Sequence, residues 1–222
     1  MDDPNNIGPF TAKSALNLPR KWYSNHFNSQ LELLTSFIKL SSEEIKDSKI
    51  KYLYGKENIE YDLGDGETGI ITYYEGVDDQ TFALDDIFVT YFPDLKRKSN
   101  FIMIISHLED GFRELCKDLS KEFSIKFKSR NGKGIFYAIS LFLNSSLKLD
   151  FDIENDVNWK NLILAYNIRN KIVHLTEKKI SETELKIFKI SEEFIFSDET
   201  HEILFEEIHS FLKKLEIELL KK

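Results

Sequence analysis

Apolar residues recur at three- and four-residue steps along most of this 222-residue chain, the spacing that places them on one face of an α-helix. The strongest pattern lies at 100–119, where Ser99 or Asn100 can cap a helix with a single apolar stripe. Pro93 is expected to end a shorter helix before it. The predicted helices cover residues 24–46, 84–91, 100–119, 134–147, 157–175 and 199–220. Packed side by side, they predict a mainly α fold, a bundle of four or five longer helices.

Residues 50–83 interrupt the helical pattern. Apolar and polar residues alternate from Ile59 to Leu63, which is the period of a strand. The dipeptide Asp65-Gly66 favours a tight turn, and an apolar run from Ile70 to Tyr74 follows it. The segment therefore predicts a β-hairpin inserted into the helical protein.

The two ends of the chain carry weaker patterns. Near the C-terminus, Leu185-Lys186-Ile187 and Phe194-Ile195-Phe196 predict a short C-terminal strand pair. Proline and glycine punctuate residues 1–25, which predict an extended N-terminal arm. Since no internal repeat or linker divides the remainder, residues 26–222 are expected to form one helical domain with the hairpin insertion.

Composition restricts the function. A net charge of −8 argues against a broad, nonspecific grip on nucleic acid, so any positive contact with RNA has to be local. Cys116 is the only cysteine, which excludes an intrachain disulfide, and its apolar register indicates a core position. No apolar run approaches the roughly 20 residues of a membrane span. The polar, acidic start differs from a signal peptide, so we expect a cytoplasmic protein without membrane contact.

A polar motif stands out in the helix predicted at 157–175. The run Arg169-Asn170-Lys171-Ile172-Val173-His174 places Asn170 and His174 one turn apart on the same face. Arg169 shares a neighbouring face with Tyr166 and lies about 140° from His174 around the helix axis. Such residues can flank one pocket in a groove between helices, or at an interface where a second copy of the helix faces the first.

This motif resembles the signature of the HEPN (higher eukaryotes and prokaryotes nucleotide-binding) superfamily, in which Arg and a polar residue precede His by three further positions. The helix at 101–109 is similar to an early helix of that bundle, and Gly132-Lys133-Gly134-Ile135 leads into the next helix in the same order. The resemblance covers about residues 100–222. It implies a HEPN-like helical bundle acting as a metal-independent endoribonuclease, without cofactor, as a homodimer in which two motif helices meet.

The residue types suit cleavage of RNA, which carries its own nucleophile, the 2′-hydroxyl. A histidine, with an ordinary pKa near ~6.5, can accept the proton of that hydroxyl or protonate the leaving oxygen, so His174 is the candidate acid or base. A guanidinium binds two phosphate oxygens at once, so Arg169 is the candidate anion-binding group. Asn170 can orient either the histidine or the phosphate.

Other residues are candidates for supporting roles. Ser106 and Glu109 lie on a helix expected near the motif, where Glu109 can orient Arg169, and Tyr166 flanks the same face. A basic connector between two predicted helices can contact the RNA backbone, although it is equally a solvated loop. The predicted RNA-binding residues are Lys126, Lys128, Arg130, Lys133 and Lys171.

Several alternatives stay open. Arg169 can be a surface arginine paired with an acid, and His174 near a helix C-terminus is favoured by the helix dipole. Glu206 and His209 form a single Glu-x-x-His pair, too little for a di-iron site, so no metal is expected. The resemblance suggests the toxin of a toxin–antitoxin or phage-defence system, with a nucleotidyltransferase-like antitoxin as a partner. The alternatives are a non-catalytic interaction module and a nucleotide-sensing domain.

Overall fold

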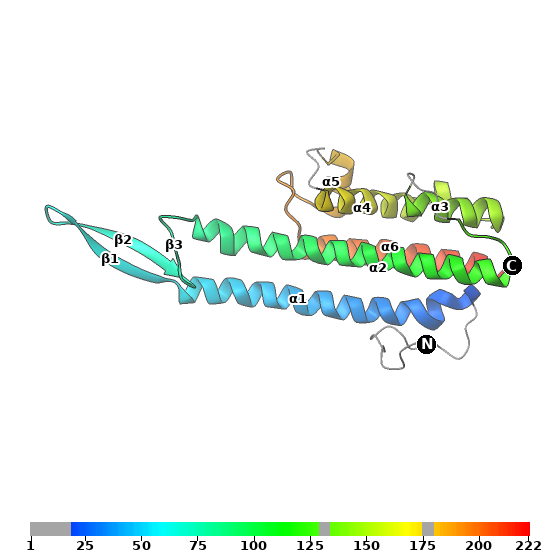
Figure 1. The fold of residues 1–222 in the computed structure, drawn as a ribbon, viewed down its shortest axis with the longest axis horizontal. Coiled ribbons are helices and arrows are strands. Elements are labelled where there is room, and N and C mark those ends of the chain that lie inside the picture. The colour runs from blue at the N-terminus through cyan, green and yellow to red at the C-terminus, as the bar shows by residue number, and fades with distance from the viewer. Residues whose placement is uncertain (1–18, 129–133, 175–179) are drawn as a thin grey trace, which may run out of the picture.

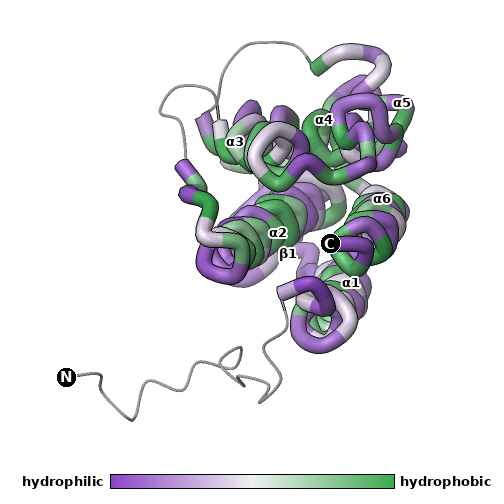
Figure 2. Tube along the Cα trace, turned by 90° about the vertical axis from the view of Figure 1, so that its right-hand side faces the viewer, coloured by the Kyte–Doolittle hydropathy of each residue, from purple (hydrophilic) through white to green (hydrophobic). Residues whose placement is uncertain are grey.

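Two long helices set the length of the molecule. The computed structural model describes residues 19–128, 134–174 and 180–222, in which α1 spans Asn28–Gly55 and α2 spans Phe92–Glu122. The other helices are α3 Ile135–Leu141, α4 Val157–Val173, α5 Glu182–Phe188 and α6 Asp198–Leu219. Figure 1 shows α1, α2 and α6 running side by side, with α3, α4 and α5 stacked on α2. The end-on view in Figure 2 places α2 between α1 and the α3–α4 layer.

Polar caps fix where three helices begin. The Asp156 side chain accepts a hydrogen bond from the Trp159 amide at the start of α4. Ser181 forms a capping box with Glu184 ahead of α5, and Ser197 forms one with Thr200 ahead of α6. These caps satisfy amides that have no partner within the helix. The predicted starts of α4 and α6 agree with the structure to within one residue.

Pro93 does not end a helix, so the predicted break is wrong. A wider π-helical turn, Asp86–Tyr91, leads directly into α2, and the Phe92 amide donates to the Ile87 carbonyl. Such a turn accommodates the proline ring and its missing amide without breaking the helix. Asn100 is therefore not a cap; its side-chain amide donates to Ser41 Oγ at 3.0 Å and links α2 to α1.

The hairpin is confirmed. Strands β1, Glu57–Gly64, and β2, Glu67–Tyr74, pair antiparallel with Ile59 opposite Ile71, and β3, Val77–Asp78, adds a short third strand. Figure 1 shows the hairpin extending beyond the ends of α1 and α2. The insertion therefore projects from the helical bundle rather than packing on it.

The predicted C-terminal strand pair is wrong. Its first half lies in α5, because the Ser181 capping box starts a helix there and Lys189, with φ of 52°, ends it in a left-handed turn. Its second half forms no strand; the Phe196 ring is buried and its amide donates to the buried carboxylate of Asp94 at 2.8 Å. Capping chemistry and single anchoring contacts outweigh a three-residue apolar alternation.

The described part of the predicted N-terminal arm, residues 19–25, is helical rather than extended. Helical turns at Pro19–Lys21 and Tyr23–Phe27 precede α1, and residues 1–18 lie outside the described ranges. The Tyr23 hydroxyl lies 2.7 Å from His209 Nδ1 of α6. Residues 19–27 are thus part of the helical bundle.

A close contact between Phe27 and Gly111 joins the N-terminal turn to α2. A Cβ atom on Gly111 would lie 2.3 Å from Phe27 Cε2, and Phe27 is fully buried under a stacked Trp22 ring. Cys116 is also fully buried, as predicted, and burial raises the pKa of its thiol. Within the described ranges, no helix is both long and apolar enough to cross a membrane.

Because the added Cβ would lie as close as 2.3 Å to the Phe27 ring, overpacking should cost about 2–3 kcal/mol, the upper part of its usual range. Better helix propensity returns about 1 kcal/mol, so Gly111→Ala should destabilise the protein by about 1–2 kcal/mol. Chemical denaturation measures the change. Phe27→Leu in the Gly111→Ala background should cost less than the two single losses added, because the shorter side chain vacates the contact. The neighbouring exposed change Asp110→Ala should stay within about 0.5 kcal/mol. A neutral or stabilising Gly111→Ala would contradict this packing.

Candidate functional site

The helix that carries the motif, α4, is fixed along its length by α6. Glu207 of α6 accepts hydrogen bonds from the side-chain amides of Asn158 at 2.6 Å and Asn161 at 2.9 Å. Lys214, two helical turns further along α6, donates to Asp156 at 2.7 Å. Because these contacts hold the start of α4, the direction of its C-terminal end is defined.

The buried face of α4 determines where the motif lies. Trp159, Leu162, Ala165 and Ile168 are at most 1% exposed and pack in the core. Arg169 follows directly after this face and is therefore half-buried at its edge. The motif thus begins where the core ends.

Unlike the other described arginines, Arg169 has no carboxylate partner among the residues that the structure describes. Its Nη1 donates to Asn170 Oδ1 at 2.9 Å, and its Nε is buried without a hydrogen-bond acceptor. An unsatisfied buried donor of a charged group is costly, so the present contacts of Arg169 do not fully stabilise its guanidinium. The other arginines in the described ranges each pair with an acid: Arg20 with Glu122, Arg97 with Asp198 and Arg113 with Glu109.

Asn170 connects both ends of the motif. Its side chain accepts from Arg169, and its carbonyl accepts from the His174 amide at 3.0 Å. His174 occupies the C-cap of α4, with its side chain exposed. The three predicted catalytic residues therefore lie in the last part of α4 and at its C-cap, with the His174 side chain exposed to a ligand or a second chain.

Lys171 forms an ion pair with Glu184 of α5. Its ammonium lies 2.9 and 2.7 Å from the two carboxylate oxygens of Glu184, which is 4% exposed. Burial acts to raise the pKa of Glu184, but hydrogen bonds from Lys171 and Ser181 outweigh it and hold that pKa below its ordinary value. The predicted RNA-binding charge of Lys171 is thus already matched, and sequence reasoning missed its partner.

The predicted supporting residues on α2 do not reach Arg169 by a hydrogen bond or ion pair in the described ranges. Glu109 accepts from Arg113 at 3.3 Å, one turn along the same helix. Ser106 is half-buried on α2. An i,i+4 partner on its own helix therefore competes with the predicted contact between Glu109 and Arg169.

Tyr166 lines a pocket beside the motif. The pocket has a volume of about 460 Å³, and the Tyr166 ring lies 5.0 Å from Phe136 of α3. Tyr166 precedes Arg169 and Asn170 by one turn, but Arg169, Asn170 and His174 do not line the pocket. Sequence reasoning found Tyr166 but missed the polar residues that share this pocket. They are Tyr137, Ser140, Glu154 and Asn167.

The basic connector is partly described. Lys126 and Lys128 are exposed and alternate with Ile125 and Phe127, which pack against the core. This alternation directs both ammonium groups outward. The predicted RNA-binding residues Arg130 and Lys133 lie outside the described residues.

Negative charge is concentrated in one part of the chain. Residues 56–86, which contain the hairpin and are called the hairpin extension below, hold ten Asp or Glu residues against one lysine. Their net charge of −9 exceeds the −8 of the whole chain, which leaves the rest at +1. The helical bundle that carries the motif is therefore close to neutral, and the composition argument against RNA contact applies mainly to the hairpin extension.

Comparisons with known proteins assign no family: no family model matches the chain, and neither a curated protein nor a solved structure is significantly similar to it. Among the described residues, no group of three or more His, Cys, Asp and Glu side chains is arranged to hold a metal ion. The chemistry of the candidate site therefore has to be argued from Arg169, Asn170 and His174.

Glu184→Gln should lower the free energy of unfolding at pH 7 by about 1–2 kcal/mol, because the amide pairs more weakly with Lys171. The lowered pKa of Glu184 means that the carboxylate stabilises the fold above its unfolded value near ~4.3 and stops doing so as pH falls through the folded value. The difference between wild type and variant should therefore shrink below about pH 4, as measured by urea denaturation. The exposed neighbour Glu182→Gln is the control, and equal losses in both variants would contradict the ion pair's role.

Proposed function

We propose that this protein is a metal-independent endoribonuclease of the HEPN type, with Arg169, Asn170 and His174 as its catalytic residues. The observation that carries the proposal is the half-buried guanidinium of Arg169, which hydrogen-bonds Asn170 but pairs with no carboxylate among the described residues, on the same helix end as the exposed His174. A phosphate diester supplies the negative charge that the described residues do not bring to this guanidinium. Other described arginines are already neutralised by carboxylates.

In the proposed reaction, His174 accepts the proton of a ribose 2′-hydroxyl, whose oxygen then attacks the adjacent phosphorus. The phosphorus–5′-oxygen bond breaks, which leaves a 2′,3′-cyclic phosphate on one fragment and a protonated 5′-hydroxyl on the other. Arg169 stabilises the negative charge that builds on the phosphate oxygens. Asn170 accepts a hydrogen bond from the guanidinium through its side chain and so helps to orient Arg169.

A single motif supplies one histidine, whereas the reaction needs a base and an acid. We therefore place the site at a two-fold contact between motif helices, where one His174 acts as the base and the partner's imidazole as the acid. The exposure of His174 at the end of α4 leaves it accessible to such a partner. The aromatic pocket beside Tyr166 suits a nucleobase of the bound RNA, since bases stack on aromatic rings.

An unrestrained ribonuclease stops growth, so this role fits a toxin of a toxin–antitoxin or phage-defence system. A nucleotidyltransferase-like antitoxin is the partner that the HEPN resemblance suggests. The basic residues of the connector, Lys126 and Lys128 among those described, are then the local contacts to the RNA backbone.

Arg169→Ala and His174→Ala should each abolish growth arrest on expression and lower the rate of RNA cleavage. Loss of proton transfer lowers a rate by roughly 10²–10⁴-fold, and loss of a charge-stabilising donor by about 10²-fold or more. Cleavage of a defined single-stranded RNA measures both, and EDTA should leave the wild-type rate unchanged. Arg20→Ala and His26→Ala, outside α4, are matched controls. If the wild type and both variants behave alike, stay folded and do not cleave RNA, the result would favour a non-catalytic interaction module.

A mixed dimer tests the two-histidine arrangement. One His174→Ala protomer paired with one wild-type protomer should lose most of its cleavage activity, because either the base or the acid is missing. Differently tagged protomers, purified in tandem, supply the mixed dimer. Full activity in that species would exclude a mechanism that needs both histidines.

A further inference from the structure

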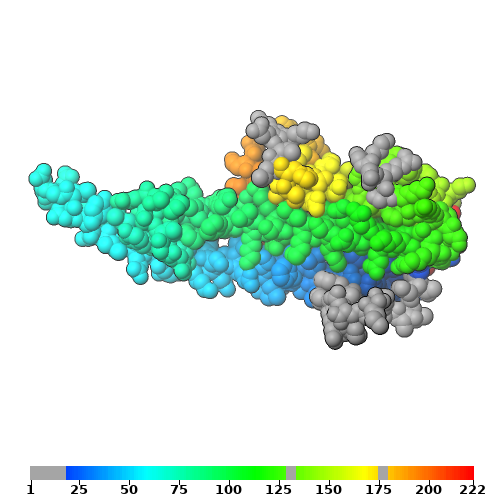
Figure 3. Space-filling view, viewed as in Figure 1, coloured from blue at the N-terminus to red at the C-terminus, as the bar shows by residue number. Residues whose placement is uncertain are grey.

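The hairpin exposes an apolar face that the helical bundle does not cover. Register places Ile59 and Ile71 opposite each other, with Tyr61 next on the same face over Gly69. Ile59 is 50% exposed, and the space-filling view in Figure 3 shows the hairpin standing free of the bundle. A two-stranded hairpin is marginally stable in water, and exposed apolar patches commonly mark interaction sites. This free apolar face therefore indicates a binding surface for a partner.

The outer edge of β1 is open along its whole length. In the described residues, β1 pairs only with β2, so half of its backbone amides and carbonyls face outward. Exposed edges are usually blocked by lysine, proline or a covering element. β1 contains neither lysine nor proline; it carries Glu57, Glu60 and Asp62, and a bulge follows Asp62. This edge is able to accept another strand.

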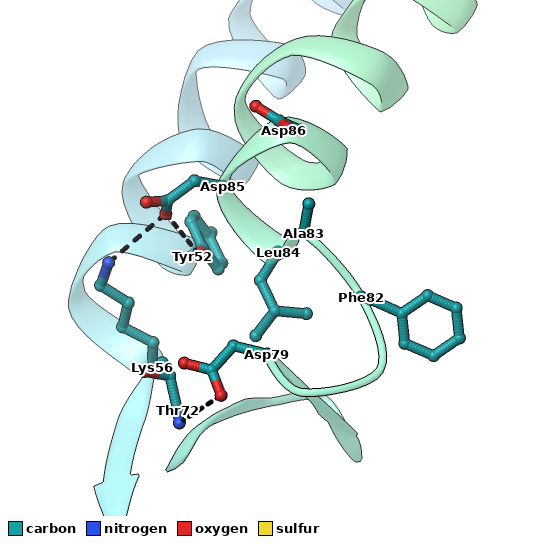
Figure 4. Close-up of a pocket in the computed structure, with 9 residues that line it drawn as sticks. All are labelled: Tyr52, Lys56, Thr72, Asp79, Phe82, Ala83, Leu84, Asp85 and Asp86. Atoms are coloured by element: carbon teal, nitrogen blue, oxygen red, sulfur yellow. Dashed lines mark hydrogen bonds and ion pairs between the residues drawn. The ribbon is translucent and has the colours of Figure 1, made fainter. Parts of the chain in front are cut away.

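The base of the hairpin is fixed, which gives the free face a defined direction. In Figure 4 the Tyr52 hydroxyl from α1 donates to Asp85 at 2.5 Å, and Lys56 Nζ lies 3.4 Å from the same carboxylate. Burial and the Asp85 hydrogen bond raise the pKa of Tyr52 to about 12, so the hydroxyl remains a donor at neutral pH. The Tyr52 ring also contacts Tyr74 of β2 and Phe88, each at 5.0 Å between centroids.

The negative charge of the hairpin extension restricts which kind of partner can cover the Ile59 face. The hairpin extension has a net charge of −9, which repels RNA and anionic membranes. It also disfavours a second copy, because antiparallel pairing of two β1 edges would bring Glu60 and Asp62 of both copies together. A basic strand would instead be attracted, since its cationic side chains would face the carboxylates of Glu60 and Asp62.

We propose that the hairpin extension docks a basic protein, which adds a strand along the free edge of β1. Its alternate side chains are apolar, against the Ile59 face, and cationic, against Glu60 and Asp62 on the other face. This surface is remote from α4 in Figure 1, so it is a second functional surface and does not depend on the proposed ribonuclease activity.

A blocked peptide of alternating lysine and valine, with the eight-residue length of β1, is the probe for the full-length protein. We expect saturable binding, with amide NMR shifts concentrated in Glu57–Gly64 and an affinity that falls as salt rises. Ile59→Thr should weaken binding about fivefold or more. Ile70→Thr should change it less than about twofold, because Ile70, at 61% exposure, lies on the opposite face next to Glu60.

Two further comparisons separate edge pairing from charge attraction. Glu60→Gln with Asp62→Asn should weaken binding about tenfold, and N-methylation of alternate peptide amides should abolish it, because the hydrogen bonds to β1 are lost. The proposal is overturned if a lysine–glycine peptide of equal charge binds as well, or if the N-methylated peptide does. It is equally overturned if the protein dimerises through the hairpin in sedimentation experiments, or if single-stranded RNA shifts the β1 amides.

Discussion

The burial of Phe112 is the contact on which the rest of the structure depends. This residue of α2 is fully buried, and its ring meets Phe136 of α3 at 5.9 Å, Trp159 of α4 at 5.7 Å and Phe211 of α6 at 6.0 Å between centroids. Edge-to-face pairs of this kind add about 0.5–1.5 kcal/mol each beyond area burial. The Phe112 ring thus helps to fix α4 relative to α2, α3 and α6. Because the motif lies at the end of α4, its position depends on the same packing.

Long-range apolar periodicity predicted the helices that surround this core, because each buries one continuous stripe. It failed where a local polar contact decides the structure. The three-residue alternation at 185–187 predicted a strand, but the capping box of Ser181 and Glu184 starts a helix there. A helix break was expected at Pro93, but a π-helical turn carries the helix past it. Sequence patterns record which faces are buried, whereas these outcomes depend on the hydrogen bonds that become available once neighbouring turns form.

The candidate site was predictable to the same extent. Helical geometry alone placed Asn170 and His174 on one face and Arg169 beside them, and the structure adds a hydrogen bond from Arg169 to Asn170. The sequence did not predict which acidic residue each basic residue near the motif would pair with. Glu184 pairs with Lys171 and Glu109 pairs with Arg113, so neither carboxylate is available to Arg169, which has no acid partner among the described residues. That choice depends on which side chains meet in space, and no spacing rule encodes it.

Segregation of charge connects the site with the hairpin extension. A chain with a net charge of −8 is expected to bind RNA weakly if the charge is evenly spread, because every face of the protein then repels the phosphates. Here the excess lies in residues 56–86, at the end of the molecule away from α4. Repulsion between surface charges is largely screened beyond about 8 Å at physiological salt, so acids at the hairpin hardly affect a ligand at Arg169. One chain can therefore carry an acidic docking surface and an anion-binding motif without either weakening the other.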